Sequence, residues 1–61
     1  MAFIRNLEYQ IDCVVLYYLE HQPINNIVSY FDNKFSVDDI TMFIDDLQKD
    51  SNLLNSIINR I

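Results

Sequence analysis

Hydrophobic residues recur at three- and four-residue steps along most of the chain, which is the spacing of helices with one buried face. The clearest helix is expected over residues 37–48. Ser36 and Asp39 have the spacing of a capping box with Asp in the Glu/Gln position, so the helix should begin at Val37. Its expected buried face consists of Val37, Ile40, Phe43, Ile44 and Leu47.

The opposite side of this helix is strongly acidic. We call it the acidic face, and it consists of Asp38, Asp39, Met42, Asp45 and Asp46. One interpretation is a solvated surface with an incidental exposed methionine, since single exposed apolar residues are common. The other is a binding surface for a basic protein partner, in which the flexible Met42 side chain makes an adaptable apolar contact.

A first helix is expected over residues 3–21, and it has two hydrophobic stripes. The first stripe is Leu7, Ile11, Val14, Val15 and Tyr18. The second, which we call the self-association stripe, is Tyr9, Cys13, Leu16 and Tyr17. Residues 13–19 alone would also suit a buried strand, but the flanking helical spacing favours a helix.

A helix with two apolar sides needs two surfaces to cover it. A chain of 61 residues is expected to supply only one of them, so a partner protein or a second copy of the chain should cover the self-association stripe. Of these two we expect the second copy, which would make the protein a homodimer. The alternative is that this helix lies at the centre of the bundle, with its tyrosines half exposed and their hydroxyls hydrated.

The remaining hydrophobic positions predict two further helices. Pro23 marks a break and the start of a second helix over residues 23–31, because proline suits the first turn of a helix. A polar turn over residues 32–35 follows, with Phe35 placed to act as a hydrophobic staple. A last helix is expected over residues 51–60, capped by either Asp50 or Ser51. Its expected apolar face is Leu53, Leu54, Ile57, Ile58 and Ile61.

The chain has no glycine, so tight hairpin turns with positive φ are disfavoured. We therefore predict an all-α fold, a single domain over residues 1–61 that forms a small three- to four-helix bundle. Residues 7–54 have the outline of a helix-turn-helix without a wing. The helix in the recognition position begins with Asp38 and Asp39, which would meet bases and phosphates with carboxylates, so direct nucleic acid binding is not expected.

The charge balance points the same way. Nine acidic residues against four basic ones give a net charge of −5, and the basic residues are scattered. Such a surface repels phosphate backbones and attracts basic proteins. Polar residues interrupt every apolar run, so we expect no membrane span, and no signal peptide is recognisable. The single cysteine fits a reducing compartment, which favours an intracellular, cytoplasmic protein.

Catalytic chemistry has little support in the sequence. His21 is the only histidine and is expected at a helix end, where it would complement the helix dipole. Cys13 lies on an apolar stripe without nearby cations, so its thiol should be an inert packing group. The carboxylates of the acidic face are too widely spaced and solvated to hold a metal. We expect no enzyme activity, no metal and no cofactor.

These features favour a small acidic interaction or regulatory module that is homodimeric through its first helix. One form of this hypothesis is an inhibitor that occupies the basic surface of a nucleic-acid-binding protein. The size and the Ile/Asn/Asp-rich composition suit a viral or plasmid-like small protein. The alternatives are a helix-turn-helix DNA-binding transcriptional regulator and a structural subunit of a larger assembly.

Overall fold

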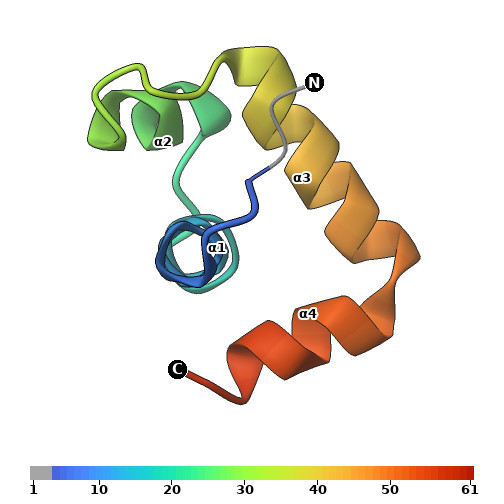
Figure 1. The fold of residues 1–61 in the computed structure, drawn as a ribbon. Coiled ribbons are helices and arrows are strands. Elements are labelled where there is room, and N and C mark those ends of the chain that lie inside the picture. Colours follow the sequence, from blue (N-terminus) through green and yellow to red (C-terminus); the bar gives the residue numbers. More distant parts are fainter. Residues whose placement is uncertain (1–3) are drawn as a thin grey trace.

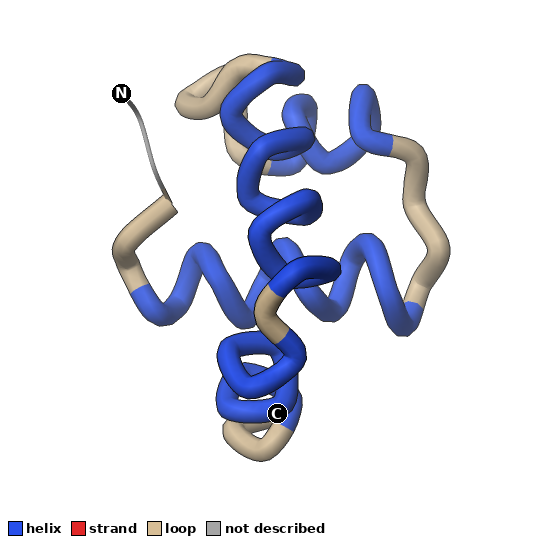
Figure 2. The backbone as a smooth tube through the Cα atoms, turned by 90° about the vertical axis from the view of Figure 1, so that its right-hand side faces the viewer, coloured by secondary structure: helices blue, strands red, loops and turns tan. Residues whose placement is uncertain are grey.

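The computed structural model describes residues 4–61, and this part of the chain is helical without strands. The elements are α1 (Leu7–Val14), the π-helix η1 (Val15–Leu19), α2 (Ile24–Tyr30), α3 (Val37–Lys49) and α4 (Ser51–Ile58). Figure 1 shows α1 end-on, with α2 above it, α4 below it and α3 along one side. Figure 2 shows α3 crossing over the segment formed by α1 and η1. The prediction of a small all-α bundle is confirmed.

The central position of α1 decides how both of its hydrophobic stripes are covered. Cys13 and Val14 lie on different stripes, and neither side chain is accessible to solvent. The rest of the self-association stripe is half-buried against the same core. The expectation that the chain covers only one side of this helix is therefore wrong. The core is formed by residues from all four α-helices of the described chain and from the segments before α1 and after α2, namely Ile4, Cys13, Val14, Ile27, Phe31, Ile40, Phe43, Ile44, Leu47 and Ile57.

The first helix is shorter and less regular than its predicted span of residues 3–21. Within the described residues it begins at Leu7, because the Asn6 side chain accepts a hydrogen bond from the backbone N–H of Glu8 at 2.8 Å and caps the helix. Residue 3, the first of the predicted span, lies outside the described part of the chain. From Val15 the helix continues as η1, and the N–H of Glu20 donates to the carbonyl of Val15 at 2.9 Å. None of the five η1 residues is fully buried.

The capping box of α3 is confirmed. The Ser36 hydroxyl accepts from the N–H of Asp39, and the Asp39 carboxylate accepts from the N–H of Ser36, both at 3.1 Å. Four of the five predicted core residues of α3 are buried. Val37 is exposed instead, because it is the first residue of α3 and lies at the end of the buried face.

The cap of α4 is Asp50, whose carboxylate accepts from the N–H of Leu53 at 3.2 Å. Only Ile57 of the predicted apolar face is fully buried, and Leu53 and Leu54 are half-buried. Ile58 and Ile61 are exposed, contrary to expectation. The buried face of α4 contains fewer residues than the sequence pattern predicts, because among the described elements only α1 and α3 pack closely against this helix.

Helix α2 begins one residue later than predicted, with Pro23 in the capping position, and ends at Tyr30. Its C-terminus closes with two backbone hydrogen bonds, from Asp32 to the carbonyl of Ser29 at 3.0 Å and from Asn33 to the carbonyl of Val28 at 3.1 Å. This is the Schellman pattern, in which a left-handed residue follows the helix. Asp32 and Asn33 take that conformation, with φ of 54° and 60°.

Candidate functional site

The acidic face lies on α3, and the capping box and the buried residues of the helix hold it in place. Asp38, Asp45 and Asp46 are exposed, and the Met42 side chain is 42% accessible between them. Asp39 is half-buried, and its carboxylate is engaged in the capping box. The structure therefore divides the predicted set into four solvent-facing side chains and one carboxylate that anchors the helix.

Lys49 belongs to the same surface, although the sequence pattern did not assign it there. Its ammonium lies 2.8 Å from the Asp45 carboxylate, and both side chains are exposed. The hydrogen bond and charge of Asp45 raise the pKa of Lys49. An exposed pair four residues apart on a helix adds little stability. The i, i+4 spacing of Asp45 and Lys49 was the sequence signal that could have revealed this ion pair. With Lys49 included, the surface still carries a net negative charge.

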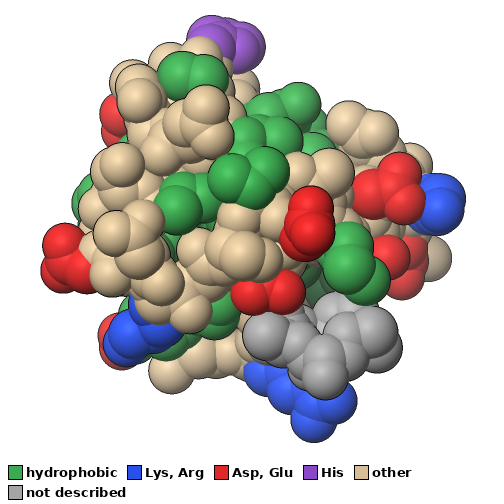
Figure 3. All heavy atoms as spheres, turned by 90° about the horizontal axis from the view of Figure 1, so that it is seen from above, with side chains coloured by type: hydrophobic (Ala, Val, Ile, Leu, Met, Phe, Trp, Pro, Cys, Tyr) green, Lys and Arg blue, Asp and Glu red, His purple; other side chains and the backbone are tan. Residues whose placement is uncertain are grey.

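Figure 3 views the molecule from the end that carries α2 and the start of α3. Acidic side chains are spread across this face, with hydrophobic side chains between them and basic ones near the margins. This end of the molecule therefore presents both negative charge and exposed apolar area.

The self-association stripe is not a single exposed surface. Cys13 lies inside the fold, and burial raises the pKa of its thiol to about 12. The thiol is therefore neutral at physiological pH, whereas a nucleophile or metal ligand must be a thiolate. Among residues 4–61 no cluster of three or more side chains has the composition to hold a metal ion.

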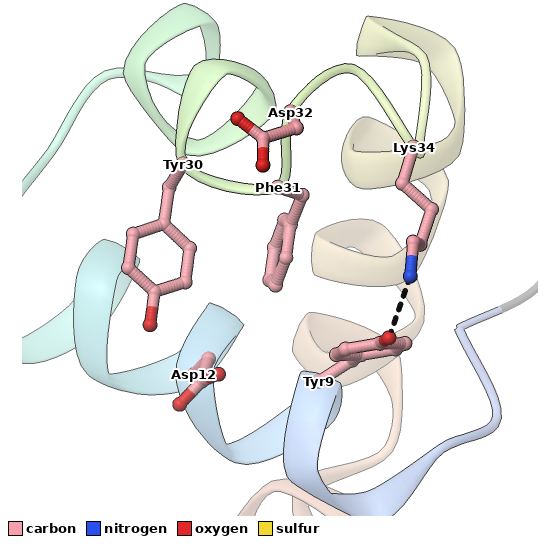
Figure 4. Close-up of a pocket in the computed structure, with 6 residues that line it drawn as sticks. All are labelled: Tyr9, Asp12, Tyr30, Phe31, Asp32 and Lys34. Atoms are coloured by element: carbon pink, nitrogen blue, oxygen red, sulfur yellow. Dashed lines mark hydrogen bonds between the residues drawn. The ribbon is translucent and has the colours of Figure 1, made fainter.

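A second feature, which the sequence pattern did not indicate, is a hollow between α1 and the end of α2. We call it the aromatic hollow (Figure 4). It has a volume of about 480 Å³ and is lined by Tyr9, Asp12, Tyr30, Phe31, Asp32 and Lys34. The Lys34 ammonium donates a hydrogen bond to the Tyr9 hydroxyl at 2.7 Å and lies 4.9 Å from the centre of the Tyr9 ring. No local pattern could have found it, because Tyr9 and Asp12 of α1 are distant in sequence from the other four lining residues, which fall within residues 30–34.

A smaller hollow of about 290 Å³ lies at the end of η1, lined by Tyr17, Tyr18, His21 and Gln22. The buried Tyr18 hydroxyl has no hydrogen-bond partner within the described part of the chain. Burial raises the pKa of Tyr18, and the charge of Tyr17 adds to the shift. His21 is exposed and has a left-handed backbone, with φ of 57°.

None of the helices formed by residues 4–61 has the length and apolar character needed to cross a membrane. Comparison with protein-family models, curated proteins and solved structures finds no match to this chain, so its surfaces are interpreted from their own geometry.

Proposed function

We propose that this protein is a small interaction module that binds a basic surface of a protein partner through the acidic face of α3. The observation that supports the proposal is the exposed Met42 side chain among three exposed carboxylates, Asp38, Asp45 and Asp46. A solvated helix needs the charges but has no need of a large apolar side chain between them. A binding surface uses both.

The construction of α3 suits a surface that binds without rearrangement. Four buried residues hold one side of the helix, and the Ser36–Asp39 capping box fixes its start. Binding therefore orders few groups beyond Met42 and the aspartate side chains. A preorganised surface loses less conformational entropy on association.

The partner we propose is a nucleic-acid-binding protein, which the chain would inhibit by occupying its basic groove. The net charge of −5 has the same sign as a phosphate backbone. An acidic helix can therefore compete with DNA or RNA for the same lysine and arginine side chains. We propose no catalytic role, in keeping with the buried, neutral Cys13 thiol.

The test compares two double variants that change the charge equally. Asp38→Asn with Asp46→Asn removes two of the four charges of the acidic face but leaves the Asp45–Lys49 pair and the capping box intact. Glu8→Gln with Glu20→Gln removes two exposed acids that lie outside α3. Affinity capture from the source cell, followed by titration of the captured partner, measures binding.

We expect the Asp38/Asp46 variant to bind the partner at least tenfold more weakly at low salt, with the difference shrinking as salt rises. The Glu8/Glu20 variant should bind like the wild type, and Met42→Ser should weaken binding at all salt concentrations. Equal binding by both double variants would show that general charge, and not the acidic face, attracts the partner.

The order α2, turn, α3 supports a second candidate, a helix-turn-helix regulator that binds DNA. Asp38 and Asp39 in the first turn of α3 oppose it, because this turn would face bases and phosphates. A mobility-shift assay at low salt distinguishes the two candidates. Sub-micromolar affinity for duplex DNA would favour the regulator and count against the acidic interaction module.

A further inference from the structure

We propose that the aromatic hollow receives an arginine side chain of a basic protein partner. This second contact site lies outside the acidic face of α3 and does not depend on the function proposed for that face. It follows from the aromatic walls of the hollow, its charges and the backbone that positions Asp32.

The walls of the hollow are preorganised aromatic rings. Figure 4 shows the rings of Tyr30 and Phe31 reaching from the end of α2 toward α1, with Tyr9 beside them. The Phe31 ring packs edge-on against Tyr30 at 5.1 Å and against Tyr9 at 5.7 Å between ring centres. Phe31 is buried, whereas Tyr30 is 56% exposed and keeps part of its surface open to a guest.

The charges in the hollow favour a cationic guest. Carboxylates of Asp12 and Asp32 stand at the α1 and α2 sides of the Tyr30 ring (Figure 4), and neither forms an ion pair within residues 4–61. The one ammonium, that of Lys34, is hydrogen-bonded to the Tyr9 hydroxyl and lies over the Tyr9 ring. Because the two carboxylates outnumber the one ammonium, which is already hydrogen-bonded, the hollow repels an anion and attracts a cation.

The shape of the site suits a guanidinium better than a primary ammonium. A guanidinium is planar, so it can stack on the exposed Tyr30 ring while its N–H groups donate to a carboxylate at the edge. A guanidinium is also less strongly hydrated than an ammonium, so it loses less hydration free energy when it leaves water. A hollow of about 480 Å³ is large enough for the end of one arginine side chain.

Asp32 occupies this position against the local preferences of the backbone. It is the left-handed residue of the Schellman turn, with φ of 54°, where glycine is the usual residue. It also places a negative charge at the C-terminal end of α2, where the helix dipole disfavours it. Both preferences would be satisfied by Asp32→Gly, which would remove the carboxylate from the hollow.

The experiment uses the full-length protein, labelled with ¹⁵N, and three blocked tripeptides. These are acetyl-Gly-Arg-Gly-amide, the same peptide with lysine, and the same peptide with the uncharged arginine isostere citrulline. Amide chemical shifts measured during titration at low salt report both the affinity and the location of binding.

We expect the arginine peptide to shift the amides of Asp12, Tyr30 and Asp32 in a saturable way, with a dissociation constant on the order of 1 mM. The lysine peptide should bind several-fold more weakly, and the citrulline peptide should cause no saturable shift. Equal binding of the citrulline peptide, or shifts confined to α3, would overturn the proposal.

Three variants complete the test. Asp32→Gly should raise the melting temperature and weaken arginine binding at least threefold, so a loss of binding cannot be ascribed to unfolding. Tyr30→Leu, at an exposed position, should weaken binding similarly. Glu20→Gln, with the same charge change at an exposed acid outside both the hollow and the acidic face, should leave binding unchanged. Wild-type affinity in both Asp32→Gly and Tyr30→Leu would contradict the proposed site.

Discussion

The Cys13 thiol is enclosed by the core at the middle of the central helix, with no solvent-accessible surface. Burial disfavours the thiolate, which raises the thiol pKa from its ordinary value of 9.0 to about 12. In the unfolded chain the same thiol ionises near its ordinary value. Above that pH the unfolded state loses its thiol proton while the folded state keeps it, so stability falls as the pH rises.

This gives a prediction for the pH dependence of stability. Between pH 8 and pH 10 the Cys13 thiol should lower the free energy of unfolding by about 1.4 kcal/mol. At pH 10, one unit above the pKa of the thiol in the unfolded chain, the unfolded state is stabilised by releasing the proton, whereas the folded state keeps it. Urea denaturation of the wild type and Cys13→Ala at both pH values isolates this effect, because the other ionisable groups are the same in both proteins and their contributions cancel in the difference.

The stability advantage of the wild type over Cys13→Ala should therefore shrink between pH 8 and pH 10. The thiol should also react slowly with a disulfide reagent under native conditions. An advantage that stays constant with pH, or rapid modification of the thiol in the folded protein, would show that Cys13 is accessible to solvent.

At the scale of the helices, side-chain caps within a few residues set where α3 and α4 begin. The Ser36–Asp39 capping box satisfies two backbone N–H groups at the start of α3, and the Asp50 carboxylate satisfies one at the start of α4. Because α3 carries both core residues and the acidic face, its start also fixes which aspartates face solvent.

The caps give a matched pair of serine substitutions. Ser36→Ala removes a cap and should lower the free energy of unfolding by about 1 kcal/mol. Ser51→Ala removes an exposed serine just after the Asp50 cap and should change stability by less than about 0.5 kcal/mol. Thermal or urea unfolding measures both. A larger loss in Ser51→Ala than in Ser36→Ala would mean that Ser51, and not Asp50, caps α4.

At the scale of the whole molecule, α2, α3 and α4 lie above, beside and below α1 (Figure 1), and residues from both of its hydrophobic stripes pack on one core. Tyr9 contacts the rings of Phe31 at 5.7 Å and Phe35 at 5.5 Å, both from the segment between α2 and α3. Leu16 and Tyr17 are half-buried against the same core. The stripe thus gives no independent reason for a second copy of the chain, although self-association remains a prediction of the sequence.

A charge at Leu16 distinguishes the two expectations. A dimer interface predicts that Leu16→Glu is a folded monomer, whereas packing within one chain predicts a less stable fold. We expect the second outcome, with a loss of about 2 kcal/mol, because a carboxylate replaces a side chain packed on the core. Leu19→Glu, at an exposed position of the same segment, should change stability by less than about 0.5 kcal/mol.

Urea unfolding at two protein concentrations, together with light scattering after size-exclusion chromatography, measures both quantities. Unfolding of the wild type that depends on protein concentration would indicate a dimer. If Leu16→Glu were then a monomer as stable as the Leu19→Glu control, the stripe would be the dimer interface after all.

The sequence by itself determined the features that depend on neighbours three or four residues apart. The Ser36–Asp39 box and the four buried residues of α3 were predicted from spacing alone, because a cap and a helix face are local properties of the chain. The exposed side of α3 followed from the same period. The all-α class followed from helical periodicity and the absence of glycine.

The tertiary structure alone decided which apolar stripes are covered and which distant side chains meet. Each side of α1 contributes a fully buried residue, Cys13 or Val14. Predicted apolar positions at the helix ends, namely Leu7, Val37, Ile58 and Ile61, remain exposed, because burial depends on where other helices cross and not on the period of one helix. The aromatic hollow exists because folding brings Tyr9 against Lys34, 25 positions away in the sequence. Contacts over such separations are set by the packing of the whole chain, so no local spacing could reveal them.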